Sequence, residues 1–367
     1  MPWSSEKMAQ IVTIKDVAQL AEVSIGTVSR VFNNHKNVNE DIRERVLQAA
    51  AELGYRGPAG RSSAGQKKGK TLKEIGFLLY SQLQDPVEKG AVAPFWAKIL
   101  HGAEAEAQKA NIKVTYRAIS SARETPQALL GQFPEMRPDG ILLVGPADAA
   151  TIDAIRSLNI PLVLVDNYLR RPALDAVLSA NFEGTMEAME YLIGQGHRRI
   201  AAISGLLNSG PHPTNLLYTI EWRIRGYREA LLNAGLPVDE ALIEACLLSP
   251  EGGYQACKRL LARGMQCSAI FCANDPTAVG VLKALREEGF SVPQDISVVG
   301  FDDDMAEYLT PALTTVGVKK EAMGATAVNT LIERFHNPGA VAKTITLGVE
   351  LIKRDSVAPY PPVEADR

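Results

Sequence analysis

The sequence predicts an all-α helix-turn-helix domain followed by a larger α/β domain whose parallel sheets form two lobes. Near the N-terminus, apolar residues recur at helical spacing in three short segments. From residue 75 onward, short apolar runs such as GILLVG and PLVLVD alternate with helical segments, which is typical of parallel sheets covered by helices on both faces. Because 367 residues exceed one ordinary core, the larger domain is expected to divide into two lobes.

The first predicted helix begins after Thr13, whose hydroxyl can cap it. Its apolar residues fall at positions i, i+3, i+4 and i+7 and therefore share one face: Ile14, Val17, Ala18 and Ala21. Glu22 and Val23 then form a short turn. This segment is the first half of a helix-turn-helix pattern.

The second predicted helix is capped by Ser24, and its inward face consists of Val28, Val31 and Phe32. Its outward face consists of Ile25, Gly26, Ser29 and Arg30. A third helix begins after Asn39 and stops at Gly54. Its inward residues are Ile42, Val46, Ala49, Ala50 and Leu53. The three segments together predict a helix-turn-helix unit.

The outward face of the second helix suits a nucleic acid. It offers small hydrogen-bonding residues and one arginine, with no carboxylate that would repel phosphates. Residues 1–74 hold twelve Lys and Arg against eight Asp and Glu, a net charge of +4, whereas the rest carries 27 against 34, or −7. A basic N-terminal part fits DNA, although a solvated surface would give the same count. The alternative interpretation is a three-helix packing module.

The segments TIKDVAQLAEVSIGTVSRVFN and VNEDIRERVLQAAAELGYR closely resemble the DNA-binding domain of the lactose/galactose repressor (LacI/GalR) family, and the resemblance continues through most of the chain. It implies an effector-controlled repressor that binds a palindromic double-stranded DNA operator as a homodimer. By this resemblance the residues that read base edges are Ile25, Gly26 and Arg30. The implied phosphate contacts are Thr13, Ser24, Thr27, Ser29 and Asn33. Gly26 departs from the family, in which a side chain commonly reads bases at this position.

Residues 58–74 form a linker that also departs from the family pattern. Family members usually place here a short hinge helix that forms on the operator and inserts a leucine into the minor groove. The matching residue is Ser63 or Ala64, and neither side chain is a large apolar wedge. The glycines of this segment disfavour a helix, and its lysines are expected to attract phosphates nonspecifically at most. We therefore interpret the linker as a basic, solvated tether.

The resemblance implies that residues 75–360 form a periplasmic-binding-protein-like domain that binds the effector and dimerises. Its chain is expected to cross between the lobes near Asp166, Phe301 and Val318. The boundaries that follow are an extension at 1–12, the helix-turn-helix domain at 13–57, a near lobe at about 75–166 and 318–338, a far lobe at about 167–317 and 339–360, and a tail at 361–367. The C-terminus VAPYPPVEADR lacks heptads, so no C-terminal coiled coil is expected.

Ligands of open parallel sheets bind beyond the carboxyl ends of strands, so the residues that end the apolar runs are effector candidates. These residues are Asp166, Ser204, Asn274 and Asp302. Their carboxylate, amide and hydroxyl groups suit hydrogen bonds to the vicinal hydroxyls of a sugar. The alternative for Asp166 is that it satisfies backbone donors at a lobe crossing. Asn274 and Asp302 also match effector-contact positions of the family.

The resemblance adds three effector residues. Arg223 matches the family's effector-binding arginine, Trp96 matches an aromatic residue that stacks on effector rings, and Leu248 falls where some relatives carry another aromatic residue. A surface ion pair is the structural alternative for Arg223, and a core position is the alternative for Trp96. Helix caps are expected from the acidic residues that follow two of the apolar runs, Asp275 before Pro276 and either Asp303 or Asp304.

The remaining features exclude several classes of protein. The four cysteines, which lack histidines at metal-ligand spacing, are expected to be reduced thiols: Cys246, Cys257, Cys267 and Cys272. No catalytic or cofactor-binding motif occurs, so we expect neither an enzyme nor a cofactor or metal. The first residues lack a signal-peptide pattern and no window of about eighteen apolar residues occurs, so we expect a cytoplasmic protein without membrane contact.

Two alternative functions stay open at this point. The first is a regulator that responds to a nucleobase or nucleoside in place of a sugar. The second is a secreted solute-binding receptor without DNA function, which would share the larger domain but would need a signal peptide in place of the helix-turn-helix. The N-terminal pattern favours the regulator.

Overall fold

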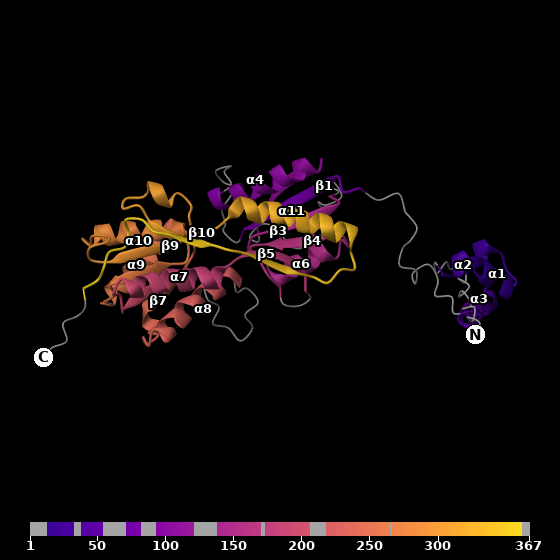
Figure 1. Ribbon diagram of the computed structural model, residues 1–367, viewed down its shortest axis with the longest axis horizontal. Coiled ribbons are helices and arrows are strands. Elements are labelled where there is room, and N and C mark those ends of the chain that lie inside the picture. The colour runs from indigo at the N-terminus through magenta and orange to yellow at the C-terminus, as the bar shows by residue number, and fades with distance from the viewer. Residues whose placement is uncertain are drawn as a thin grey trace, which may run out of the picture. The chain divides into compact units, whose positions relative to one another are not determined.

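A computed structural model of the chain describes residues 13–32, 38–53, 71–81, 93–120, 138–169, 173–205, 218–264 and 266–361. The chain forms two compact units, Met1–Thr71 and Leu72–Arg367. Figure 1 shows the smaller unit as a cluster of helices and the larger unit as two sheets with helices on their faces.

The smaller unit consists of three helices, α1 (Ile14–Leu20), α2 (Ile25–Phe32) and α3 (Glu40–Glu52). At the start of α1 the Asp16 carboxylate accepts hydrogen bonds from the backbone N–H and the hydroxyl of Thr13, both at 2.6 Å. At the start of α2 the Thr27 N–H donates to Ser24 Oγ at 3.1 Å. The buried apolar residues are Val17, Ala18, Ala21, Val28, Val31, Val46, Ala49 and Ala50. These caps and this core confirm the predicted helix-turn-helix.

The larger unit contains two six-stranded sheets. All pairings in the first sheet are parallel, and its order is β11-β5-β4-β3-β1-β2. Its strands are β1 (Glu74–Ser81), β2 (Lys113–Ser120), β3 (Gly140–Val144), β4 (Leu162–Val165), β5 (Asp175–Ser179) and β11 (Thr344–Leu347). Strands such as β3 and β4 are apolar throughout because helices cover both faces of the sheet.

The second sheet has the order β12-β10-β9-β8-β6-β7 and is parallel except for the antiparallel pair β10–β12. Its strands are β6 (Ile200–Gly205), β7 (Ile243–Cys246), β8 (Ala269–Cys272), β9 (Ser297–Asp302), β10 (Thr314–Gly317) and β12 (Glu350–Ile352). The two sheets confirm the predicted α/β fold with two lobes.

Helices cover both sheets (Figure 1). Those of the first lobe are α4 (Pro94–Lys109), α6 (Ala149–Arg156) and α11 (Lys320–His336). Those of the second lobe are α7 (Asn181–Gly194), α8 (Tyr218–Asn233), α9 (Pro250–Ala262) and α10 (Asp275–Glu287), with short 3-10 helices η2 (Glu240–Leu242) and η3 (Ala306–Tyr308). The connections between the lobes therefore precede α7, precede α11 and follow β11.

The predicted crossings near Asp166 and Phe301 are wrong. The chain passes from the first to the second lobe at Ala180, because β5, which follows Asp166, pairs with β4 in the first sheet. Phe301 lies within β9, and the next strand, β10, pairs with β9 in the same sheet. The chain returns to the first lobe at Val318, and β11 pairs with β5 before β12 joins the second sheet. The near lobe thus also contains 175–179 and 344–347.

Helices α4 and α11 pack closely because glycines lie at their contact. A Cβ atom added to Gly324 of α11 would lie 2.0 Å from the Ile99 carbonyl oxygen, and one added to Gly102 of α4 would lie 2.1 Å from the Glu321 carbonyl oxygen. Backbone atoms cannot move aside as a flexible side-chain tip can. The close approach of these two helices therefore depends on glycine at both positions.

We expect Gly324→Ala to lower the free energy of unfolding by about 1–3 kcal/mol, because the added methyl group forces α4 and α11 apart. Urea unfolding of the full chain measures the change. Gly194→Ala is the matched control, because Gly194 also lies in a helix but has no atom within 4 Å of an added Cβ. The control should be neutral or stabilising by about 0.5–1 kcal/mol. Equal effects of the two substitutions would contradict the packing argument.

Candidate functional sites

The first candidate site is the outward face of α2. Ile25 is 46% exposed, and Gly26 and Arg30 are also exposed, whereas Val28 on the opposite face is completely buried. The first turn of α2 carries no acidic residue. The helix therefore presents an apolar side chain, a bare backbone position and one guanidinium to solvent. These groups can enter a DNA groove without bringing a carboxylate to the phosphates.

The hydroxyl groups proposed to contact phosphates lie at the start of α1 and at the start and middle of α2. Ser24 Oγ and Thr27 Oγ1 lie 2.9 Å apart and share a hydrogen bond, so the cap fixes both side chains. Ser24 is exposed, and Thr13, Thr27 and Ser29 are half-buried. Asn33, the remaining predicted phosphate contact, lies outside the described residues.

The second candidate site is a cavity of about 90 Å³ in the larger unit. Residues of both lobes line it: Trp96, Pro146, Asp166 and Asn167 from the first lobe, and Tyr218, Thr219 and Leu248 from the second. The structure thus brings together three of the residues predicted to contact an effector, Trp96, Asp166 and Leu248. Tyr218, Thr219 and Asn167 were not predicted.

A buried arginine organises the second lobe beside this cavity. The Arg223 side chain is 4% exposed, its Nε donates to Asn181 Oδ1 at 2.8 Å, and its Nη2 donates to Asp302 Oδ1 at 3.0 Å. Its Nη1 donates to the Ala273 carbonyl oxygen, and its guanidinium carbon lies 3.6 Å from the centre of the Phe301 ring. The predicted residues Arg223 and Asp302 are therefore paired. A surface ion pair, the alternative for Arg223, is wrong.

Asp166 and Asp302 are two carboxyl groups that interact with this one guanidinium. The pKa of Asp166 is raised to about 7, mainly by burial, with Arg223 opposing the shift and Asp302 adding to it. Burial likewise raises the pKa of Asp302 to about 6, with Arg223 and Lys320 opposing and Asp304 adding to the shift. Asp166 Oδ1 is buried and has no hydrogen-bond partner among the described residues. An acceptor in this state is suited to a ligand that donates a hydrogen bond.

Asn274 and Ser204 end neighbouring strands but do not line the cavity. Asn274 caps α10, because its Oδ1 accepts from the Thr277 N–H at 3.0 Å, and its Nδ2 donates to the Leu248 carbonyl oxygen at 3.5 Å. Ser204 is buried, and its Oγ has no hydrogen-bond partner within the described parts of the chain. The amide of Asn274 thus positions Leu248, which does line the cavity.

The expected helix caps at Asp275, Asp303 and Asp304 are wrong. Asp275 is the first residue of α10 and is fully buried, where it accepts from Thr315 Oγ1 at 2.6 Å and from the Asp304 N–H at 2.7 Å. The cap lies one residue earlier because Pro276 is tolerated at the second helical position, where its missing N–H is not needed. The residue before η3 is Met305, which makes no side-chain cap.

Sequence reasoning missed the groups that support Asp302. Lys320 is buried at the start of α11, where its Nζ donates to the Asp302 carbonyl oxygen and lies 3.2 Å from Asp304 Oδ1. Tyr218 lies five residues before Arg223 on α8, and the sequence analysis did not single it out. No sequence pattern singled out Asn181 or Lys320. Asn181 contacts Arg223 and Lys320 contacts Asp302 only because the chain crosses between the lobes just before each residue.

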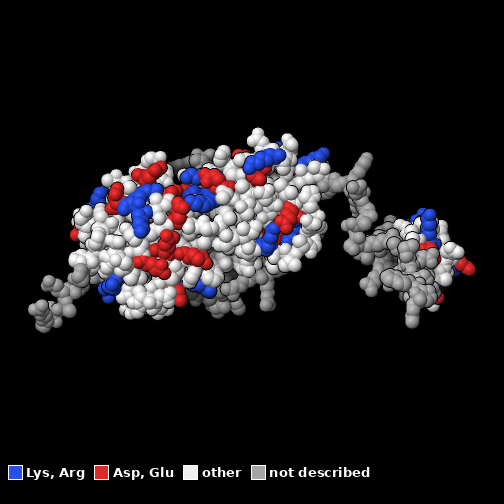
Figure 2. Space-filling model, in the orientation of Figure 1, with Lys and Arg blue, Asp and Glu red and all other residues white. Residues whose placement is uncertain are grey.

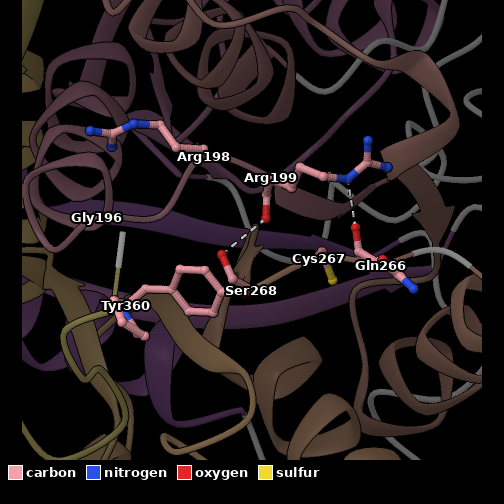
Figure 3. A pocket seen from close by; sticks show the side chains of 8 residues that line it. Gly196, Arg198, Arg199, Gln266, Cys267, Ser268 and Tyr360 are labelled. Atoms are coloured by element: carbon pink, nitrogen blue, oxygen red, sulfur yellow. Dashed lines mark hydrogen bonds between the residues drawn. The ribbon is translucent and has the colours of Figure 1, made fainter. Parts of the chain in front are cut away.

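A larger cavity of about 560 Å³ lies at the other end of the second sheet, next to the residues that begin β6 and β8 (Figure 3). Figure 3 shows the side chains of Arg198 and Arg199 pointing away from one another. Arg199 Nε donates to the Gln266 carbonyl oxygen at 2.8 Å, and Arg198 Nη1 donates to that of Ile193 at 2.8 Å. These diverging groups do not converge on one ligand.

Comparison with known proteins finds a matching family domain in each of the two units. Residues 13–57 match the bacterial regulatory proteins of the lacI family, and residues 189–357 match the periplasmic binding protein-like domain. The chain is 31% identical over 346 residues to the ribose operon repressor of Haemophilus influenzae, a match that covers 94% of this chain and 98% of that protein. The chain belongs to the LacI family. It is therefore a DNA-binding regulator of transcription.

Further relatives of this LacI-family regulator are repressors or transcriptional regulators. It is 36% identical over 356 residues to the transcriptional repressor PurR of Erwinia tasmaniensis, covering 95% of this chain and 98% of that one. The regulator CelR, solved as a cellobiose complex, matches with 29% identity and a TM-score of 0.69, covering 94% and 100%. The lac repressor dimer bound to operator and the anti-inducer ONPF matches with 26% identity and a TM-score of 0.65, covering 95% and 100%.

The described residues of this regulator hold no cluster of three or more His, Cys, Asp or Glu that could bind a metal. Its four cysteines are free thiols, of which Cys246, Cys257 and Cys272 are buried. Within the described ranges, no helix combines the length and apolar character needed to span a bilayer.

We expect Asp166→Asn to stabilise the folded chain at neutral pH. Folding raises the pKa of Asp166 from 3.8 to about 7, so ionising this carboxyl costs more in the folded chain than in the unfolded chain. This cost in folding free energy begins near the unfolded-chain pKa of 3.8, grows as the pH rises, and reaches its full size above the folded-chain pKa of about 7. The amide should therefore raise the free energy of unfolding by about 4 kcal/mol at about pH 8, and by clearly less at about pH 5.

Urea unfolding of the full chain at both pH values measures this difference. Asp153→Asn is the control, because the exposed Asp153 carboxylate only pairs with Arg156 at 2.8 Å on the surface of α6. A stabilisation by Asp166→Asn that does not change with pH would show that folding does not raise the pKa of Asp166.

Proposed function

We propose that this chain is a repressor that reads a palindromic operator through α2. Its affinity for the operator either falls or rises when a sugar binds between the lobes. The observation that supports an effector is the cavity lined by residues of both lobes, with a carboxylate oxygen that has no partner among the described residues. A ligand that touches both lobes favours one lobe arrangement over another, which is how binding can change operator affinity. The ribose operon repressor and the CelR–cellobiose complex among the relatives support a sugar.

The proposed contacts divide by their position in the structure. Trp96, Asp166 and Leu248 line the cavity and would touch the effector directly. Asp302 and Arg223 form the polar base beside it, with Arg223 holding Asp302 in place. Asn274 would act through Leu248, and Ser204 would offer a buried hydroxyl at the end of β6.

The smaller unit is the part of the chain that we propose to contact DNA. On the face shown in Figure 2, acidic and basic side chains of the larger unit lie side by side, so this face offers no continuous basic surface. The α2 face instead combines Ile25, Gly26 and Arg30 without an acidic neighbour in its first turn. An arginine in a major groove can donate two hydrogen bonds to guanine, so Arg30 is the proposed base contact.

We expect Arg30→Ala to weaken binding to the cognate operator by about 1–3 kcal/mol and to weaken binding to random DNA much less, because a base contact carries sequence information. Fluorescence anisotropy titrations at one fixed salt concentration measure both affinities. Gln48→Ala, on an exposed position of α3, is the control and should bind like the parent chain. Equal losses on the operator and on random DNA would make Arg30 a phosphate contact.

A homodimer is proposed to form through an exposed apolar surface of the second lobe. Tyr308 is 78% exposed and Met305 is 59% exposed, and Tyr308 lines a cavity of about 600 Å³ with Phe290, Leu309 and residues of α10. Large exposed apolar side chains gathered in one place are typical of a protein interface. A second copy is the proposed partner, because a palindromic operator requires two-fold pairing. The related lac repressor structure is a dimer.

We expect Tyr308→Arg to weaken dimerisation at least tenfold, because two charged side chains would be brought into one apolar interface. Analytical ultracentrifugation over a range of concentrations measures the dimer dissociation constant. Leu232→Arg is the matched control, since Leu232 is 60% exposed on α8 and does not line this cavity. A dimer of unchanged strength in the Tyr308 variant would place the interface elsewhere.

A further inference from the structure

The turn between α1 and α2 contains no glycine, although the turn of a helix-turn-helix often does. Glu22 and Val23 form this turn and follow Ala21, the capping residue of α1. Their N–H groups donate to the carbonyl oxygens of Gln19 at 3.3 Å and Ala18 at 3.0 Å, respectively. This pair of hydrogen bonds ends a helix by placing the residue after the cap in the left-handed region of backbone conformation.

Glu22 occupies that left-handed position, with a φ of 54°. An L-residue with a Cβ atom is strained there, because the Cβ atom approaches the following carbonyl oxygen, and glycine is the usual choice. Glu22 is exposed, so burial of its side chain does not offset the strain. A strained backbone of this kind persists only where the surrounding structure holds it in place.

Arg45 of α3 supplies that support. Its Nη2 donates to the Ala21 carbonyl oxygen at 2.6 Å, across 24 positions of the sequence. The last turn of α1 carries no basic residue of its own, and the carbonyl groups at a helix end lack partners within the helix. A cation at this end also interacts favourably with the partial negative charge of the helix C-terminus. Arg45 therefore ties the residue directly before Glu22 to α3.

The direction of α2 depends on this turn, because Ser24, the residue after Val23, already caps α2. A change in the φ of Glu22 would rotate α2 together with every side chain on its outward face. Among the eight buried apolar residues described in this unit, Val28 and Val31 belong to α2. With two buried anchors, α2 also needs a fixed turn to keep its direction.

We propose that Arg45 is a positioning residue for operator recognition, which holds the strained turn at Glu22 and thereby sets the angle at which α2 meets the DNA. This inference rests on the proposed function, since it assumes that α2 reads the operator. Arg45 needs no contact with a base for this role. Its effect is coupled to Glu22, because Glu22→Gly removes the strain and should make the support from Arg45 dispensable.

The test compares two affinities of the full chain, one for an operator and one for a scrambled duplex of the same length and composition. The operator is the duplex that the parent chain selects from a library of random double-stranded DNA. Fluorescence anisotropy at one fixed salt concentration gives both dissociation constants, and their ratio measures sequence discrimination. Partial unfolding, or loss of a phosphate contact, weakens binding to both duplexes by the same factor and leaves the ratio unchanged.

We expect Arg45→Met to lower the discrimination ratio about tenfold, because the substitution removes a charged donor from a helix-end carbonyl. Arg45→Lys, which keeps a charged donor, should stay within about threefold of the parent chain. The double variant with Glu22→Gly and Arg45→Met should also return to within about threefold, because the turn then needs no support. Gln48→Met is the control, since Gln48 is exposed on the same helix, and it should leave the ratio unchanged.

An unchanged ratio in the Arg45→Met variant, with or without weaker binding to both duplexes, would overturn the inference. A double variant that discriminates no better than Arg45→Met alone would overturn it as well. Arg30→Ala in the same assay keeps the two proposals apart. If Arg30→Ala leaves the ratio unchanged, the proposed reading of the operator by α2 fails. If Arg30→Ala lowers the ratio and Arg45→Met does not, only the positioning role of Arg45 fails.

Discussion

The proposed effector site depends on the ion pair between Arg223 and Asp302. The Arg223 guanidinium connects three segments that are distant in the sequence: Asn181 at the start of α7, Ala273 after β8 and Asp302 at the end of β9. Lys320 reaches the same place from the start of α11 and donates to the Asp302 carbonyl oxygen. α7 and α11 each follow a lobe crossing, so the starts of both helices are tied to this one ion pair, α7 through Arg223 and α11 through the backbone of Asp302. Removing one partner of such a pair leaves an uncompensated buried charge, which costs about 3–5 kcal/mol.

Buried aspartates around this ion pair carry a cost in folding free energy when no ligand is bound. Five aspartates lie in this region, Asp166, Asp275, Asp302, Asp303 and Asp304, and three of them have raised pKa values because burial disfavours their charged forms. Asp166 has no compensating hydrogen bond on its buried oxygen among the described residues. A ligand that donates to this oxygen restores the missing interaction, so the cost in the ligand-free protein becomes a source of binding free energy.

In the smaller unit, helix α2 is held in place by a local helix cap and a small apolar core. Its helix α2 begins at a hydroxyl cap, in which Ser24 accepts from the Thr27 N–H and shares a second hydrogen bond with the Thr27 hydroxyl. Eight buried apolar residues from three helices hold α2 in place, so its outward face needs no charged residues for stability. That face is therefore available for Ile25, Gly26 and Arg30. The proposed sequence-reading residues and the proposed effector-binding residues lie in different units of the chain.

The sequence by itself determined the local features of this protein. Caps and helical periodicity predicted the helices around Thr13, Ser24 and Asn39, and the alternation of apolar runs with helices predicted the α/β lobes, because these signals act over a few residues. Strand ends pointed to Asp166 and Asp302. The tertiary structure alone decided the crossing at Ala180, the cap at Asn274, the contact of Tyr218 with the cavity and the commitment of all three Arg223 nitrogens. Those outcomes depend on strand partners such as β5 and β11, which pair although more than 150 residues separate them, and no short-range pattern encodes that choice.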